Sequence, residues 1–90
     1  NNGQTCAALK RLYVHESIHD ELCDELVKIA NSVKTGNGLE ADSDFGPLQN
    51  ESQFNLVKEL ADDAKVQGGN FLCGGEVIND TGYLVMAYVW

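Results

Sequence analysis

The 90-residue sequence has few basic residues and no long apolar run. Its six lysines and arginines stand against 14 acidic residues, which gives a formal net charge of −8. Such a surface repels both a phosphate backbone and an anionic bilayer, so we expect neither a nucleic-acid nor a membrane partner. The apolar runs are only a few residues long, so no segment is predicted to span a membrane. The 43% of apolar residues nevertheless fits one small globular domain.

Paired cysteines are also missing, because the chain has only Cys6, Cys23 and Cys73. An odd number cannot all pair within one chain, and the spacings match no zinc-finger or redox-pair motif. We therefore expect free thiols in a reducing compartment, and a cytoplasmic location. Cys23 and Cys73 lie in apolar patterns, where they are expected to serve as small buried side chains.

The first of two predicted helices follows a Ser17 N-cap, with Asp20 as the capping-box acid. Apolar residues then recur at spacings of three and four, which indicates one buried stripe on about four turns of helix. Gly36 is the predicted end of this helix. The stripe consists of Ile18, Leu22, Leu26, Ile29 and Val33.

The second predicted helix starts at Asn50 as N-cap, with Gln53 at the capping-box position. It is predicted to end at Gly68 and Gly69. Its expected buried face consists of Phe54, Val57, Leu60, Ala61 and Ala64. Residues 35–49 form the one long loop, and a loop of this length in a small domain is usually functional or supported by other segments.

Three strands are predicted, at residues 11–15, 70–73 and 83–90. The resulting order of strand, helix, loop, helix, strand and strand predicts an α/β fold. The last strand is apolar on both faces and has no charge to protect its edge, and two helices are too few to cover it. Since the chain also begins at Asn1 rather than at a methionine, we expect an excised piece or a processed start. We expect the last strand to be covered by a second copy of the chain or by the remainder of a larger protein.

Cys6 lies in a turn of small residues, Gly3-Gln4-Thr5-Cys6, before a short stretch predicted to be helical. Backbone N–H groups in such a turn can stabilise a thiolate and hold an oxyanion, which suits a nucleophile. On spacing alone, an ordinary turn that carries an incidental thiol is the better interpretation, because short motifs match often.

This motif closely resembles the nucleophile motif of the aldehyde dehydrogenase superfamily, and the resemblance continues along nearly the whole chain. It covers a strand and helix after the nucleophile, a glycine turn, a Gly-Pro loop, a helix start and late strands. These landmarks lie at residues 11–22, 34–39, 45–49, 50–54, 71–76 and 82–83. The resemblance implies that residues 1–90 are a segment of the catalytic domain, part of a three-layer α/β architecture.

The resemblance also implies an activity. Cys6 matches the catalytic thiolate, which attacks the carbonyl of a small aldehyde; a hydride then passes to NAD or NADP, and water cleaves the thioester to a carboxylate. The Cys6 backbone N–H would be one donor to the oxyanion. Gln53 matches a position that approaches the adenosine ribose of the cofactor, and this role is compatible with helix capping.

Several parts of the family pattern are expected to lie outside this segment. The general-base Glu, the Asn of the oxyanion hole and the dinucleotide-binding segment would precede Cys6, and a Glu-x-Phe-Gly-Pro cofactor motif would follow Trp90. Leu56 stands where several members carry a ribose-contacting Lys, and Ala87 and Tyr88 replace a usual Pro-Thr pair. We therefore expect the isolated chain to be inactive. The alternative is a truncated, non-enzymatic member that acts as an interaction module.

Two other clusters suggest metal sites only weakly. His15, His19 and Cys23 are spaced four apart and would share one face of a continuous helix, as zinc ligands can. His15 ends a predicted strand, however, and a fourth ligand is not evident. The acidic residues of the loop and second helix lack the frame of a calcium loop; these are Asp42, Asp44, Asp62 and Asp63. We therefore predict no metal site.

Overall fold

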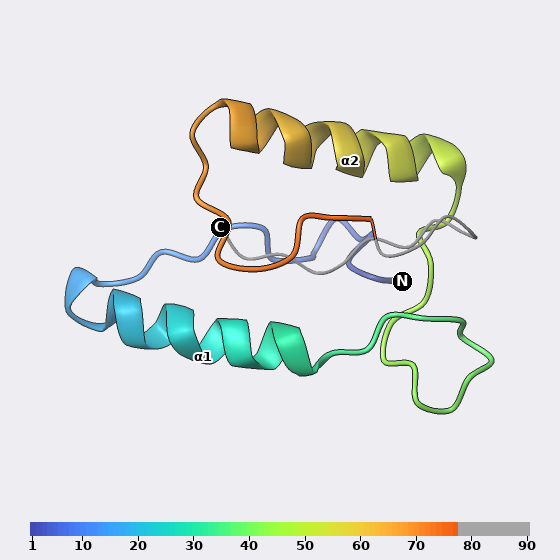
Figure 1. Cartoon of the computed structure of the whole chain (residues 1–90), viewed down its shortest axis with the longest axis horizontal. Helices are drawn as coiled ribbons and strands as arrows, with labels where there is room; N and C mark the ends of the chain where they lie inside the picture. The colour runs from blue at the N-terminus through green and yellow to red at the C-terminus, as the bar shows by residue number, and fades with distance from the viewer. Residues whose placement is uncertain (78–90) are drawn as a thin grey trace.

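The computed structural model describes residues 1–77. A 3-10 turn, η1 (Glu16–Ile18), leads into helix α1 (His19–Ser32), and helix α2 (Glu51–Val66) follows the long loop. Figure 1 shows the two helices running in opposite directions as outer layers. The segments at residues 1–10 and 70–77 pass between them. Within residues 1–77, neither helix has the length and apolar character needed to cross a bilayer.

Helix α1 begins and ends differently from the prediction. Ser17 is not its cap: the His15 ring nitrogen Nδ1 accepts a hydrogen bond from the Ser17 N–H at 3.2 Å and caps η1 instead. Ile18 at the α1 N-cap gives no side-chain cap. The helix stops before Gly36, because Val33 is already extended, with φ −77° and ψ 126°. β-Branched residues favour this conformation.

The buried face of α1 is rotated relative to the predicted stripe. Leu22, Leu26 and Val33 are half-buried as expected, but Ile18 and Ile29 are 51% and 60% exposed. The half-buried residues Cys23, Val27 and Ala30 each lie one position after a residue of the stripe and widen the face on that side. The face that meets the middle layer therefore includes a cysteine.

Helix α2 confirms its predicted caps. Asn50 Oδ1 accepts a hydrogen bond from the Gln53 N–H at 2.9 Å, a contact whose loss usually costs about 1 kcal/mol. Gly68 has a φ of +90°, and the bonds from Gly68 N to Lys65 O and from Gly69 N to Ala64 O close the helix. The predicted face is buried or half-buried at Phe54, Val57, Ala61 and Ala64. The prediction is wrong for Leu60, which is 56% exposed.

The structure forms no strand among residues 1–77, so the predicted strands at 11–15 and 70–73 are not confirmed there. Thr35 and Phe45 form a parallel bridge, and single bridge positions also occur at Cys73 and Val77. An extended segment becomes a strand only when its backbone forms a ladder of hydrogen bonds with a neighbouring segment. The sequences of the two predicted strands do not specify that neighbour. The predicted strand at 83–90 lies outside the described residues.

The long loop is closed at its base by backbone hydrogen bonds. Phe45 O accepts from Gly36 N at 2.9 Å, and Lys34 O accepts from Asp44 N at 2.8 Å and from Phe45 N at 3.2 Å. A Cβ at position 36 would lie 2.7 Å from Ser43 Oγ, so a larger residue there would require the Ser43 side chain to move. The loop is thus a folded unit that leads directly into α2.

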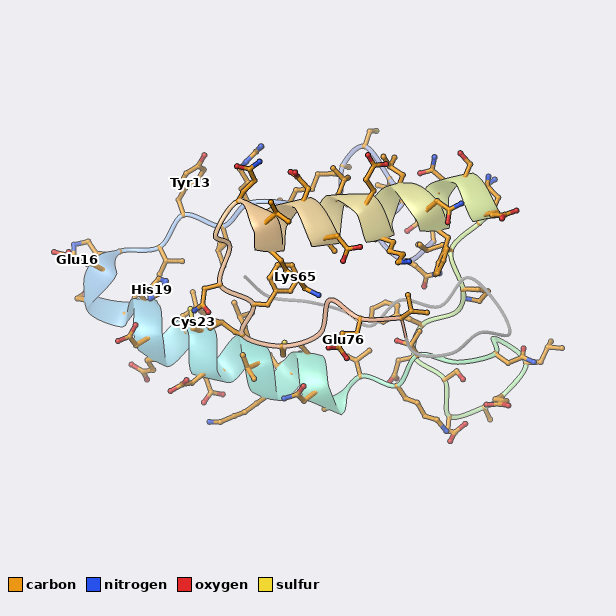
Figure 2. All side chains as sticks on the ribbon, turned by 45° about the horizontal axis from the view of Figure 1, so that its top comes forward. Tyr13, Glu16, His19, Cys23, Lys65 and Glu76 are labelled. Carbon is orange, nitrogen blue, oxygen red and sulfur yellow. The ribbon has the colours of Figure 1, made fainter. Side chains whose placement is uncertain are left out.

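A contact from α2 holds the segment after it. Lys65 Nζ donates to Gly75 O at 3.1 Å and lies 5.2 Å from the centre of the Phe71 ring. Figure 2 shows the Lys65 side chain pointing from α2 toward this segment. Gly75 has a φ of +79°, and a Cβ there would lie 2.4 Å from the Phe71 ring. A larger residue at position 75 would therefore displace the Phe71 ring and disrupt the contact with Lys65.

Candidate active site

Cys6 is an exposed free thiol in a hydrogen-bonded turn. The Ala8 N–H donates to Thr5 O at 3.1 Å, so Cys6 is one of the two central residues of the turn. Lys10 Nζ donates to Thr5 O at 3.3 Å and to Ala8 O at 3.0 Å. The predicted turn is therefore present, with a lysine closing it, but the short helix expected after it is not formed.

Two long-range hydrogen bonds attach this turn to the loop before α2. Asn2 Nδ2 donates to Pro47 O at 2.8 Å, and the Gln49 N–H donates to Gln4 Oε1 at 3.0 Å. Each bond joins residues that are 45 positions apart. The turn that is predicted to carry the nucleophile and the Gly-Pro loop, two separate landmarks of the resemblance, are thus brought side by side.

The groups around Cys6 suit the first step of a nucleophilic reaction and not the later ones. Among residues 1–77, the Cys6 N–H donates to no backbone carbonyl and is available to an oxyanion. In the same part of the chain, no imidazole or carboxylate is within hydrogen-bond distance of Cys6 Sγ. A general base must reach the proton that it removes, so this region offers a nucleophile without a base.

Gln53 lies half-buried in the first turn of α2. Its backbone N–H is used by the cap, whereas its side-chain amide makes no hydrogen bond within the described residues. Leu56 lies one turn further along and is 45% exposed. An unengaged amide fits the hydroxyls of a ribose, but the residues from Glu51 to Val57 include no cation for a diphosphate.

The depression recorded on α2 involves neither predicted residue. It is open and shallow, and its lining consists of Glu51, Ser52, Asn55, Leu56 and Glu59. Two carboxylates make it anionic, and it contains no nucleophile. It therefore gives no reason to move the candidate site away from Cys6.

The predicted clusters of ligand-type residues are separated in the structure. His15 Nδ1 lies 2.8 Å from Ser17 Oγ. In His19, the nitrogen Nε2 lies 3.6 Å from Cys23 Sγ. Within residues 1–77, no three side chains of His, Cys, Asp or Glu gather as metal ligands would. Cys23 is half-buried rather than buried, because it shares its side of α1 with His19 (Figure 2).

The acids of the long loop serve its structure. Asp42 forms an ion pair with Lys34 Nζ, and Asp44 Oδ2 accepts from the Lys34 N–H at 2.8 Å. The hydrogen bond and charge of Lys34 lower the pKa of Asp42, and the same hydrogen bond raises the pKa of Lys34. Both side chains are largely exposed, so the pair contributes little to stability.

Asn2, Gln4 and Lys10 are the residues of this site that sequence reasoning missed. Gln4 belongs to the recognised motif, but its partner Gln49 lies in a different landmark. The signal that could have indicated this contact was a pairing of the two landmarks, the nucleophile motif and the Gly-Pro loop. Nothing in the sequence near Asn2 or Lys10 indicates their acceptors.

Comparisons with known proteins agree on one family. The aldehyde dehydrogenase family matches residues 1–90. A Pseudomonas protein described as a probable aldehyde dehydrogenase is 41% identical over 85 residues, covering 94% of this chain and 17% of its own. A succinate-semialdehyde dehydrogenase [NADP(+)] from Mycobacterium avium is 36% identical, covering 92% of this chain and 18% of its own.

A solved structure agrees in three dimensions. The NAD+ complex of aldehyde dehydrogenase from Bacillus cereus superposes with a TM-score of 0.92 at 36% identity, over 97% of this chain and 18% of that one. This match confirms the α/β fold class, although the predicted strand order is not confirmed. The chain spans less than one fifth of the length of each of these relatives.

Proposed function

Because the chain belongs to the aldehyde dehydrogenase family, a family of oxidoreductases, we propose that its 90 residues form the nucleophile segment of an NAD(P)-dependent aldehyde dehydrogenase. The substrate class is a small aldehyde, which is oxidised to a carboxylate. The observation that carries this proposal is the position of Cys6. It is an exposed thiol with a free N–H, in a turn that Asn2 and Gln4 attach to the loop before α2.

The chemistry at Cys6 follows from its surroundings. Its thiolate attacks the aldehyde carbon, and the carbonyl oxygen becomes an oxyanion that the Cys6 N–H can bind. Collapse of this thiohemiacetal releases a hydride and leaves a thioester on Sγ. Hydrolysis of the thioester then releases the carboxylate. The hydrogen bonds of Asn2 and Gln4 hold the turn in one position, which lowers the entropy cost of the attack.

Gln53 is proposed to bind the cofactor through its side-chain amide. Bound NAD or NADP supplies the hydride acceptor. The amide of Gln53 is free in the described residues, and the first turn of α2 fits a ribose better than a diphosphate. The Mycobacterium avium relative is named as an NADP(+) enzyme and the Bacillus cereus structure is an NAD+ complex, so both cofactors remain within the proposal.

The proposal requires groups beyond those that the described residues place at Cys6. No base reaches the Cys6 sulfur within residues 1–77, and general acid–base help contributes about 10²–10⁴ in rate. We therefore expect no turnover from the 90 residues alone. A cytoplasmic setting, with no nucleic-acid or membrane partner, is part of the same proposal. Its support is the three free cysteines and the net charge of −8.

The exposed apolar side chains support the view that another protein surface packs against this chain. Ala61 is the one buried hydrophobic residue among residues 1–77, whereas Leu9 and Tyr13 are 94% and 91% exposed. The remainder of the parent enzyme or a second copy of the chain would cover such side chains. The same observation favours the second candidate, a non-enzymatic interaction module, if no longer form of the protein has activity.

The test is an activity assay with NAD, NADP and a panel of aldehydes, run on this chain and on a longer form of the same protein. We expect turnover only in the longer form, lost on Cys6→Ala and retained on the control Cys73→Ala. Turnover that survives Cys6→Ala would show that Cys6 is not the nucleophile. Turnover by the 90 residues alone would contradict the need for an added base.

A further inference from the structure

The chain contains two Asn-Gly pairs, Asn2-Gly3 and Asn37-Gly38, and their surroundings differ. The side chain of Asn2 is engaged, since its Nδ2 donates to Pro47 O at 2.8 Å and the residue is half-buried. Asn37 is exposed in the long loop, and its Nδ2 makes no hydrogen bond within residues 1–77. Figure 1 shows this loop projecting beyond the end of α1. The second pair therefore has an unengaged amide in open solvent.

An asparagine that precedes a glycine can react with its own backbone. The nitrogen of the next residue attacks Cγ, and glycine hinders this attack least because it has no side chain and the greatest backbone freedom. In the described part of the chain, the Gly38 N–H donates to no acceptor, and a Cβ added to Gly38 would meet nothing within 4 Å. Neither a hydrogen bond nor a neighbouring group therefore blocks the approach of Gly38 N to Asn37.

The backbone also supplies a donor for the charge that this attack creates. As Gly38 N adds to Cγ, the oxygen Oδ1 of Asn37 becomes an oxyanion. The Leu39 N–H already donates to Oδ1 at 3.0 Å, so it can stabilise this charge as it forms. The Glu40 N–H donates to Asn37 O at 2.9 Å and closes the turn that holds these groups. The nucleophile, the electrophile and the oxyanion donor thus belong to three consecutive residues.

We infer that Asn37 is a modification site, at which the amide is converted to aspartate or isoaspartate with water as the co-reactant. The bond from Gly38 N to Cγ forms while the bond from Cγ to Nδ2 breaks, and ammonia leaves with the proton of Gly38 N. Water then opens the resulting succinimide at either carbonyl, and a proton of the water restores the Gly38 N–H. The main chain continues through the original carbonyl carbon in aspartate and through Cγ in isoaspartate.

The loop can retain its base after this change. The backbone hydrogen bonds that close the base join Lys34 to Asp44 and Phe45, and Gly36 to Phe45, so none of them involves Asn37. Either product adds one negative charge to the tip. Because ammonia is lost, the reaction does not reverse, and the fraction converted should increase with the age of the molecule.

The experiment incubates the whole protein at neutral pH in water labelled with heavy oxygen, and peptide mass spectrometry follows the label at both pairs. Reaction at Asn2 must first break its bond to Pro47, so we expect Asn37 to react at least about fivefold faster. In urea both pairs lose their contacts, and the ratio of the two rates should fall toward one. A ratio of one or less in the folded protein, or a ratio that urea leaves unchanged, would overturn the inference.

Two variants test the attacking and the donating group. Gly38→Ala should slow labelling at residue 37 about fivefold, because the added side chain restricts the backbone. Labelling that is unchanged in this variant would overturn the assignment of the nucleophile.

Leu39→Pro removes the N–H that donates to Oδ1 and should slow labelling about tenfold in the folded protein, but not in urea. The matched control is Leu39→Ala, which keeps the N–H and removes only a side chain that is 94% exposed, so its rate should stay unchanged. Equal rates in the two folded variants would overturn the role of the Leu39 N–H.

Discussion

Cys6 and Cys23 are both free thiols, but they lie in regions of opposite charge that are supported in different ways. Residues 1–15 contain Lys10 and Arg11 and no acid, whereas α1 carries four acids and one lysine. The Cys6 turn is held by bonds to residues 45 positions away. The Cys23 site is set by the i, i+4 spacing of a single helix.

The two thiols therefore depend on different parts of the molecule for their positions. The Cys6 turn, whose N–H is proposed to bind an oxyanion, depends on a distant loop for its position. Cys23 contacts a residue of its own helix, with Sγ 3.6 Å from Nε2 and 3.9 Å from Nδ1 of His19. Perturbations of the loop should therefore affect Cys6 and leave Cys23 unchanged.

The largest expected effect comes from removing the long-range support. In a form of the protein that turns over aldehyde, Gln4→Ala should lower kcat about 100-fold, because small misplacements of a reacting group are costly. The matched control is Gln49→Ala, which keeps the backbone N–H that Gln4 accepts from and should have little effect. Steady-state kinetics give both values. Equal losses in the two variants would mean that the side chain of Gln49, and not the bond to Gln4, supports the turn.

A smaller effect is expected from the charge of an alkylating reagent. We expect Cys6 to be labelled before Cys73 by iodoacetamide, since it is exposed and Cys73 is half-buried. Replacing neutral iodoacetamide by anionic iodoacetate should favour Cys6 over Cys23 by about fivefold at low salt. Peptide mapping by mass spectrometry measures the ratio. If the labelling ratio of Cys6 to Cys23 is the same for both reagents, the charges around the two cysteines do not affect the reactivity of their sulfurs.

The smallest effect concerns pH and the loop that supports Cys6. The Lys34 contact lowers the pKa of Asp42 below 3.8, so the stability from this pair is present above 3.8 and is lost as pH falls through the lowered value. The pKa of Lys34 is raised above 10.5, so the same stability is lost again as pH rises through that raised value.

Amide chemical shifts of Gly36 and Phe45 should report this transition, because their backbone groups close the loop. Asp42→Asn should remove the acid transition, whereas Asp62→Asn, a change on α2, should retain it. The expected shift is small, since exposed ion pairs contribute little. An acid transition that persists in Asp42→Asn would assign it to another carboxylate.

Local features of this chain were predictable from its sequence. The Asn50 cap and the glycine end of α2 depend on neighbouring residues, and both were confirmed. The His15 cap was missed because an imidazole replaced the expected serine. The rotation of the α1 face, which brings Cys23 inward, depends on what packs against the helix and not on its own periodicity.

Non-local features were not predictable in the same way. The resemblance implies roles for Cys6 and Gln53, which stay predictions, and no pattern near Asn2 could indicate a partner in a loop 45 residues away. The strands at 11–15 and 70–73 were predicted from β-forming residues alone. Strand formation also needs a partner backbone, and residues 1–77 do not give these two segments one that forms a ladder.

The closed base of the long loop has a consequence for protein engineering. Its three backbone bonds lie at Lys34, Gly36 and Phe45, whereas Leu39 at the tip is 94% exposed and a Cβ on Gly38 would meet nothing within 4 Å. Extra residues inserted between Gly38 and Leu39 leave the base intact, and doubling a loop's length costs only about 0.6 kcal/mol. The tip is therefore a place to insert an epitope or a fluorescent reporter that is attached to neither thiol site.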